Sequence, residues 1–230
     1  MNNESAFKRF TILVKTHKLH YLFIYFLLFY AVWTLHRSIS SPYIYENYKG
    51  IEGVLINAII KVLIWAVPVF IYIRYIDERK PMTFLKLNKR ALIGLFWGIL
   101  ITLALVGVNL IKVYIFGKGK INIDVSLDNI INVVLITCIT EEIVFRGFLL
   151  NKLEEFIEFW GANIIAAILF VTIHFPIWIM EGDGITLQKV ISVMILGILF
   201  GYTYKKTDSL WSAILFHGAN NFIVSALGIK

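Results

Sequence analysis

Long apolar stretches separated by short polar segments run through the whole sequence, and this pattern excludes most soluble folds. Hydrophobic residues make up 59% of the 230 residues and charged residues only 16%, against about 45–50% and 25% in soluble domains. A helix needs about 20 apolar residues to cross the hydrocarbon core of a bilayer. The sequence therefore predicts an all-α, polytopic transmembrane bundle of about seven spans, in the ranges 19–35, 53–76, 91–116, 129–150, 161–180, 189–204 and 210–229.

The distribution of basic residues predicts how these spans are oriented. Thirteen of the 22 Lys and Arg residues lie at the N-terminus and in every second segment after it, and six lie in the alternate segments. Cytoplasmic loops carry such an excess, so we expect a multi-pass protein of the plasma membrane with a cytoplasmic N-terminus. The formal charge of +7 does not indicate nucleic acid, because the basic residues are not gathered into one stripe with interleaved aromatics. We expect one membrane-embedded domain, 1–230.

Three polar groups interrupt the later spans. The first is Glu141 with Glu142, the second is His174, and the third is His217 with Asn221. Ionisable side chains inside a bilayer cost free energy and are functional by default. Counted from the predicted cytoplasmic ends of their spans, at about 1.5 Å per residue, Glu141, His174 and His217 all lie roughly 10–20 Å deep. We therefore expect these groups to meet near the middle of the membrane.

Helical spacing predicts which side chains share a face. Glu142 and Arg146 are four residues apart in the orientation that favours an ion pair, so we expect them mainly to support the helix, with a second catalytic carboxylate as the rival role for Glu142. Glu141 is rotated by about 100° and should face another neighbour. Phe170 lies one turn before His174 and is expected to pack beside it.

The expected cluster of Glu141, His174, His217 and Asn221 suits either a divalent metal, with zinc the first choice, or a bound water. Glu141 is the candidate general base, which takes a proton from water and later returns it to a leaving amine. The two histidines would hold the metal or the oxyanion. Asn221 would act as a further ligand or stabilise the oxyanion.

Lys61 is a further basic residue inside a predicted span, on the same helical face as Asn57. Its long side chain can extend towards the membrane surface or pair with a carboxylate inside the bundle. We do not expect Lys61 to take a direct part in catalysis.

The motifs Glu141-Glu142-x-x-x-Arg146, Phe170-x-x-x-His174 and His217-x-x-x-Asn221 together resemble the CAAX protease and bacteriocin-processing group of intramembrane endopeptidases. The resemblance covers about residues 129–225, which we expect to form the catalytic core. It implies a glutamate-dependent, metal-assisted or metal-free peptidase that cleaves a membrane-associated peptide or protein. Eukaryotic members of the group trim prenylated C-termini. Bacterial members resemble maturation or immunity proteins, and this short chain is more similar to those.

Two other classes of protein remain open from the residues alone. Intramembrane Glu, His and Lys also form the relays of proton- or metal-coupled transporters, although the internal repeats and paired broken helices of many transporters are not evident. The third class is a non-catalytic membrane partner, such as an immunity or regulatory protein. The sequence leaves the oligomeric state open.

Overall fold

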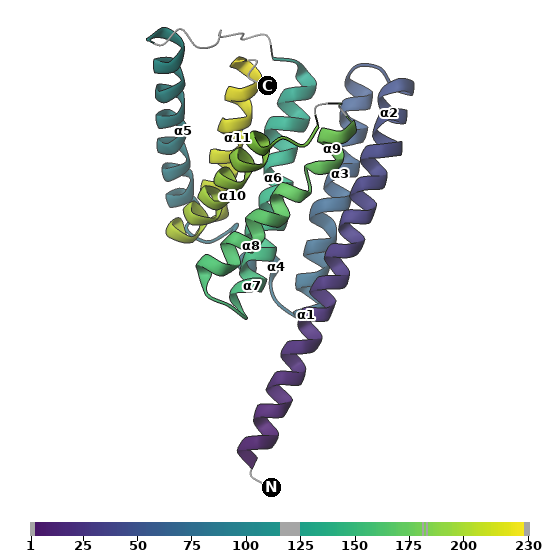
Figure 1. Cartoon of the computed structure of the whole chain (residues 1–230), viewed down its shortest axis with the longest axis vertical. Coiled ribbons are helices and arrows are strands. Elements are labelled where there is room, and N and C mark those ends of the chain that lie inside the picture. Colours follow the sequence, from purple (N-terminus) through teal and green to yellow (C-terminus); the bar gives the residue numbers. More distant parts are fainter. Residues whose placement is uncertain (1–2, 116–124, 181, 183, 228–230) are drawn as a thin grey trace.

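The computed structural model describes residues 3–115, 125–180, 182 and 184–227, and the regular elements in this part of the chain are helices (Figure 1). In chain order they are α1 (Asn3–Leu35), the π-helix η1 (His36–Ser40), α2 (Ser41–Asn47), α3 (Ile51–Ile71), the π-helix η2 (Tyr72–Ile76), α4 (Pro81–Phe84), α5 (Ala91–Tyr114), the π-helix η3 (Asn129–Thr137), α6 (Cys138–Glu142), the π-helix η4 (Ile143–Leu150), α7 (Asn151–Glu154), α8 (Phe159–Thr172), α9 (Phe175–Met180), α10 (Leu187–Thr207) and α11 (Leu210–Leu227).

The predicted all-α membrane bundle is confirmed. Five of the described helical segments are long and apolar enough to cross a bilayer, namely 19–47, 51–76, 91–111, 159–180 and 187–207. Two more helices have similar lengths. One runs without a break from η3 to α7 and carries three ionisable side chains in its middle, and the other is α11, whose 18 residues span about 27 Å. The expectation of about seven spans therefore agrees with the structure.

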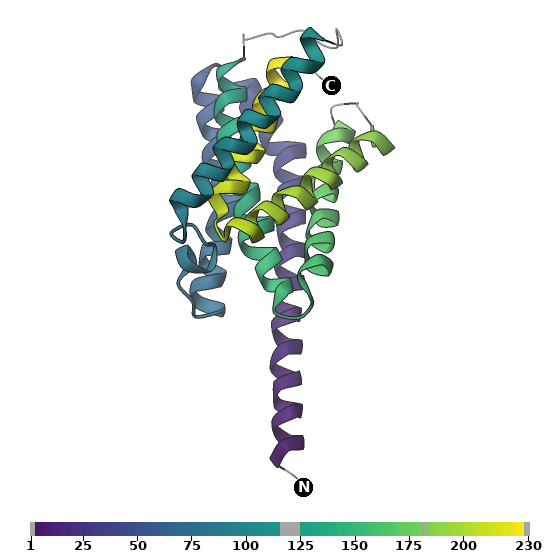
Figure 2. The same cartoon turned by 90° about the vertical axis from the view of Figure 1, so that its left-hand side faces the viewer.

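The ends of the helices alternate between the two ends of the bundle. Figure 1 shows the N-terminus, α4 and α7 at one end, and α2 and the C-terminus at the other. In the side view of Figure 2, α5 runs beside α11. Consecutive long helices thus cross the bundle in opposite directions, as a polytopic membrane protein requires.

Two predicted boundaries were wrong, and a proline explains the second. The first span was expected to end at residue 35, but the helix continues through η1 and α2 to Asn47. Pro42 lies in the first turn of α2, which follows the π-helix η1 directly, and it does not end the helix. The fifth span was expected to be one helix, but it breaks between Thr172 and Phe175. Pro176 has no N–H to donate to the preceding turn, so His174 lies at a helix end.

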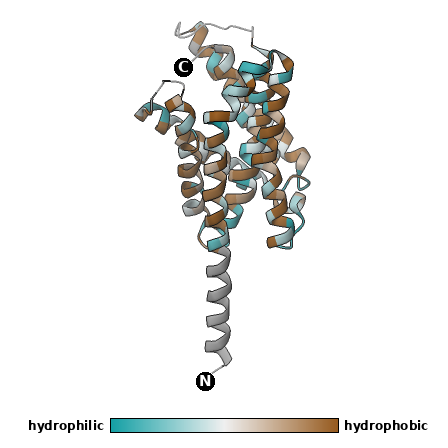
Figure 3. Cartoon of the chain, turned by 90° about the vertical axis from the view of Figure 1, so that its right-hand side faces the viewer, coloured by the Kyte–Doolittle hydropathy of each residue, from teal (hydrophilic) through white to brown (hydrophobic). Residues whose placement is uncertain are grey.

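Hydrophobic residues, brown in Figure 3, occur along all the long helices of the bundle, and many of their side chains are exposed. Large hydrophobic side chains are widely exposed, including Leu92 at 82% and Phe23 at 69%. In water such a surface would drive aggregation, whereas hydrocarbon chains cover it at no cost. The exposed side chains therefore indicate the lipid-facing surface.

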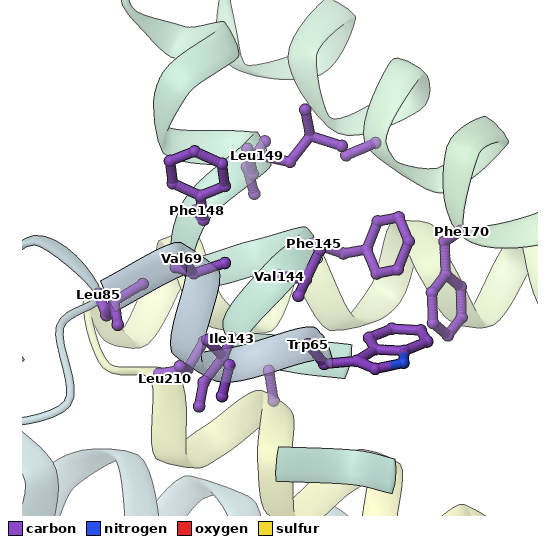
Figure 4. Packing of buried hydrophobic residues seen from close by; sticks show 14 of the residues in the cluster. Trp65, Val69, Leu85, Ile143, Val144, Phe145, Phe148, Leu149, Phe170 and Leu210 are labelled. Carbon is purple, nitrogen blue, oxygen red and sulfur yellow. The ribbon is translucent and has the colours of Figure 1, made fainter. Parts of the chain in front are cut away.

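The core is built around the helix that carries the first motif. All eight residues of η4 are buried, and their side chains pack against α3, α8 and α11 (Figure 4). Phe145 contacts Phe170 edge to face, with ring centroids 5.2 Å apart, and Trp65 lies 6.1 Å from Phe145. This aromatic packing fixes the rotation of the motif helix, and with it the direction of the neighbouring carboxylates.

Gly197 and Gly201 allow α10 to pack closely on α8, as their small-xxx-small spacing predicts. A methyl group on Gly201 would collide with the amide of Asn163, whose Cγ would lie only 2.8 Å away. Asn163 cannot easily move, because its Nδ2 donates to Ile198 O at 3.0 Å.

Gly201→Ala is therefore expected to lower the free energy of unfolding in detergent by about 1–3 kcal/mol. Gly107→Ala is the matched control, because its added methyl would meet open space and alanine favours a helix by up to about 1 kcal/mol over glycine. Equal stability of the two variants would contradict the close packing of α10 on α8.

Candidate active site

The motif helix is wider than an ordinary α-helix on both sides of the glutamate pair. The π-helices η3 and η4 flank α6, which carries Glu141 and Glu142. π-Helical turns are rare and occur frequently at functional sites. Side chains bond the displaced carbonyls, since Thr137 Oγ1 donates to Asn132 O at 2.5 Å and Thr140 Oγ1 donates to Ile136 O at 2.7 Å.

Glu142 forms the centre of a fully buried polar group. Its Oε1 accepts from Arg146 Nη1 at 3.0 Å, so the predicted ion pair forms. Arg146 also donates through Nη2 to Gly197 O at 3.0 Å, and its guanidinium lies 4.2 Å from the ring centroid of Phe170. Glu142 is 0% exposed and Arg146 1%, and Oε2 of Glu142 has no hydrogen-bond partner among the described residues.

His217 bonds the same oxygen of Glu142, a contact that the sequence did not predict. Its Nδ1 lies 2.8 Å from Glu142 Oε1, and because a carboxylate accepts, Nδ1 carries the proton. The imidazole ring stacks on Phe200 with centroids 4.7 Å apart. In neutral His217 the lone pair therefore lies on Nε2, 3.9 Å from Oε2 of Glu141.

Glu141 is 4% exposed and has two differently bonded oxygens. Its Oε1 accepts from Lys61 Nζ at 3.3 Å, so one of the two expected environments of Lys61, a carboxylate inside the bundle, is confirmed. Its Oε2 has no hydrogen-bond partner within the described residues. The sequence did not predict which carboxylate Lys61 would meet.

His174 lies at the break between α8 and α9, beside the same aromatic ring as His217. Its Nδ1 donates to Phe170 O at 2.7 Å, which leaves the lone pair on Nε2 in the neutral ring. The Phe170 ring is 4.9 Å from the His174 ring and 5.8 Å from the His217 ring. Both imidazoles lie within electrostatic range of Glu141. The predicted packing of Phe170 on His174 is confirmed, whereas the catalytic role of His174 stays a prediction.

Asn221 lies one turn after His217 on α11, but its amide is bonded to the motif helix. Nδ2 donates to Val133 O at 3.2 Å and to Cys138 Sγ at 3.4 Å. These contacts tie α11 to η3 at a carbonyl of the widened turn. The role of Asn221 as a ligand or an oxyanion donor stays a prediction.

The arrangement does not fit the predicted metal. Within the described ranges no three His, Cys, Asp or Glu side chains come together in a group that could hold a metal ion. The carboxylate of Glu141, the first expected ligand, is already paired with the Lys61 ammonium, which would repel a divalent cation. The alternative expectation of a bound water is the better match to these residues.

A carboxylate that orients an imidazole, next to a second carboxylate inside an apolar helix bundle, can hold and activate a water molecule for hydrolysis. Residues 125–223 match the family model described as type II CAAX prenyl endopeptidase Rce1-like. The match confirms the predicted resemblance over this segment and supports a membrane-embedded peptidase. No curated protein and no solved structure matches the chain significantly.

Proposed function

We propose that the protein is a glutamate-dependent intramembrane endopeptidase that processes a membrane-associated peptide or protein, in the manner of the bacterial members of its family. One observation carries the proposal. His217, oriented by Glu142, lies with Nε2 3.9 Å from an oxygen of Glu141 that has no other described partner.

A single water can bridge these two atoms. A water oxygen placed at the ordinary hydrogen-bond distance of about 2.8 Å from both atoms would form an Oε2–water–Nε2 angle of about 90°. This angle allows the water to donate one hydrogen bond to Glu141 Oε2 and one to His217 Nε2. Glu141 would take a proton from this water, and the oxygen would attack the carbonyl carbon of the scissile peptide bond. When the carbon–nitrogen bond breaks, Glu141 would return the proton to the leaving amine.

The aromatic surroundings support this reaction by excluding bulk water from the reacting groups. Phe170 and Phe200 contact His217 from two directions, so the imidazole and the carboxylates interact in a medium of low polarity. Electrostatic interactions are stronger there than in water. Because its Nδ1 donates to Phe170 O, His174 would stabilise the oxyanion, the role expected for it, as an imidazolium whose Nε2 also carries a proton.

The orientation proposed for the chain is the one with a cytoplasmic N-terminus in the plasma membrane. The N-terminus, α4 and α7 lie at one end of the bundle (Figure 1), and basic residues are concentrated around them. At this end Lys152 bonds Asp77 at 2.9 Å, and Lys86 bonds Asp208 at 3.0 Å. A basic end of this kind favours the cytoplasmic leaflet, where anionic lipids are enriched.

The proposal is tested with purified protein in liposomes and two peptides, one prenylated at a C-terminal CAAX motif and one unprenylated and inserted in the bilayer. We expect mass spectrometry to show a single cut in the unprenylated peptide. Cleavage of the prenylated peptide alone would contradict the bacterial-type substrate. Absence of any cut, with a cellular phenotype that survives replacement of Glu141, would favour a non-catalytic partner.

Removal of divalent metal is expected to change little. A strong chelator should leave the rate of cleavage within about twofold, because the donor groups here do not form a metal site and the proposed base acts on water directly. The measurement is the initial rate of cleavage before and after chelation, with a known zinc peptidase as the positive control. A loss that added zinc restores would show that the site rearranges around a metal.

A further inference from the structure

We infer that Lys61 of α3 is a positioning residue for the proposed reaction, since its ammonium holds one oxygen of Glu141 and keeps that carboxylate ionised while the other oxygen acts as the base. The inference rests on the proposed function and adds a residue outside the matched segment 125–223. It concerns the first half of the chain, which the three sequence motifs do not reach.

Hydrogen bonds and aromatic rings fix the position of the Lys61 ammonium. Its Nζ donates to Glu141 Oε1 at 3.3 Å and to Thr137 Oγ1 at 2.6 Å. Thr137 lies one turn before Glu141, so both acceptors belong to the same face of the motif helix. The rings of Trp33 and Trp65 have centroids 5.1 and 5.0 Å from Nζ, within the range of cation–π attraction. The ammonium is therefore fixed by two helices besides its own.

This contact makes the two oxygens of Glu141 unequal. Oε1 is occupied by the ammonium, whereas Oε2 has no described hydrogen bond and lies 3.9 Å from His217. Without Lys61 the carboxylate could rotate and offer either oxygen. With Lys61 in place, the oxygen beside His217 is the one available for water.

The contact also favours the charged form of Glu141. A carboxyl group removed from water tends to keep its proton, and a protonated carboxyl cannot take another proton from water. Glu141 is faced by Lys61 from α3, by His174 from the junction of α8 and α9, and by His217 from α11. On its own helix Glu142 and Arg146 compensate each other. The ammonium of Lys61 is thus the cation in hydrogen-bond contact with the proposed base.

The test is the pH profile of kcat/KM. In Lys61→Met the acid limb should move to higher pH by about 1–3 units, which is the usual effect of an opposite charge at this distance. KM should change little.

Three further variants test whether the charge of Lys61 causes the shift. Lys61→Gln removes the same charge but retains hydrogen-bond donors, and it should show the same shift. Lys61→Arg should return the acid limb to its original position with a lower kcat. Lys49→Met is the control, because it removes an equal charge from an exposed position.

An acid limb that stays in place in Lys61→Met or Lys61→Gln would overturn the inference, even if kcat fell, because a purely structural role predicts a lower rate at every pH. The Glu141→Gln variant shows whether such a result contradicts only the role of Lys61 or the proposed peptidase mechanism as well. If Glu141→Gln is inactive and the acid limb does not move, only the role of Lys61 is wrong. If Glu141→Gln cleaves at the full rate, the glutamate mechanism itself is wrong.

Discussion

Glu141→Gln is expected to lower kcat for peptide cleavage by about 10²–10⁴-fold, the usual contribution of a general base. The amide has nearly the shape of the carboxylate, and its oxygen can still accept the hydrogen bond that Lys61 donates to Oε1. It cannot take a proton from water. The loss should therefore appear in kcat with KM little changed, because the substituted group acts on the water and not on the substrate.

The measurement is steady-state cleavage of the membrane peptide in liposomes, with circular dichroism and size-exclusion chromatography to establish that the variant is folded. Glu52→Gln, in the exposed first turn of α3, is the matched control and should cleave at the original rate. If Glu141→Gln retained more than about a tenth of the original kcat, Glu141 would not be the base, and Glu142 would become the candidate.

Arg146→Met is expected to lower the free energy of unfolding by about 3–5 kcal/mol, because it leaves a buried carboxylate without its cation. Arg146 is 1% exposed and joins three elements, since it bonds Glu142, donates to Gly197 O and lies against the Phe170 ring. Methionine can fill much of the volume but supplies none of these hydrogen bonds. Unfolding is measured by titration with a denaturing detergent.

Two further variants identify the cause of this loss. Glu142→Gln combined with Arg146→Met removes both charges and should regain part of the stability, because no uncompensated charge remains. Arg79→Met breaks the surface pair with Glu155, in which the arginine side chain is 44% exposed, and should cost less than about 1 kcal/mol. An Arg146→Met variant as stable as Arg79→Met would show that water reaches Glu142 and that the site is less dry than the structure indicates.

The sequence alone was sufficient for the features that depend on one helix at a time. Apolar length predicted the membrane bundle, and four-residue spacing predicted the Glu142–Arg146 pair and the packing of Phe170 on His174. These predictions succeed because rise and rotation per residue are constant along a helix. Apolar length did not predict the break at His174, because the hydrophobic stretch continues past Pro176 without interruption.

Contacts between helices depended on the tertiary structure. From spacing alone, His217 was grouped with Glu141 and the candidate metal ligands, whereas the packed helices bring its Nδ1 to Glu142 and leave Nε2 near Glu141. Lys61 reaches the site only because α3 lies beside the motif helix. A sequence determines which side chains share a face of their own helix. Which neighbouring helix that face meets, and at what rotation, is decided by aromatic packing among residues far apart in the chain, such as Trp65, Phe145 and Phe170.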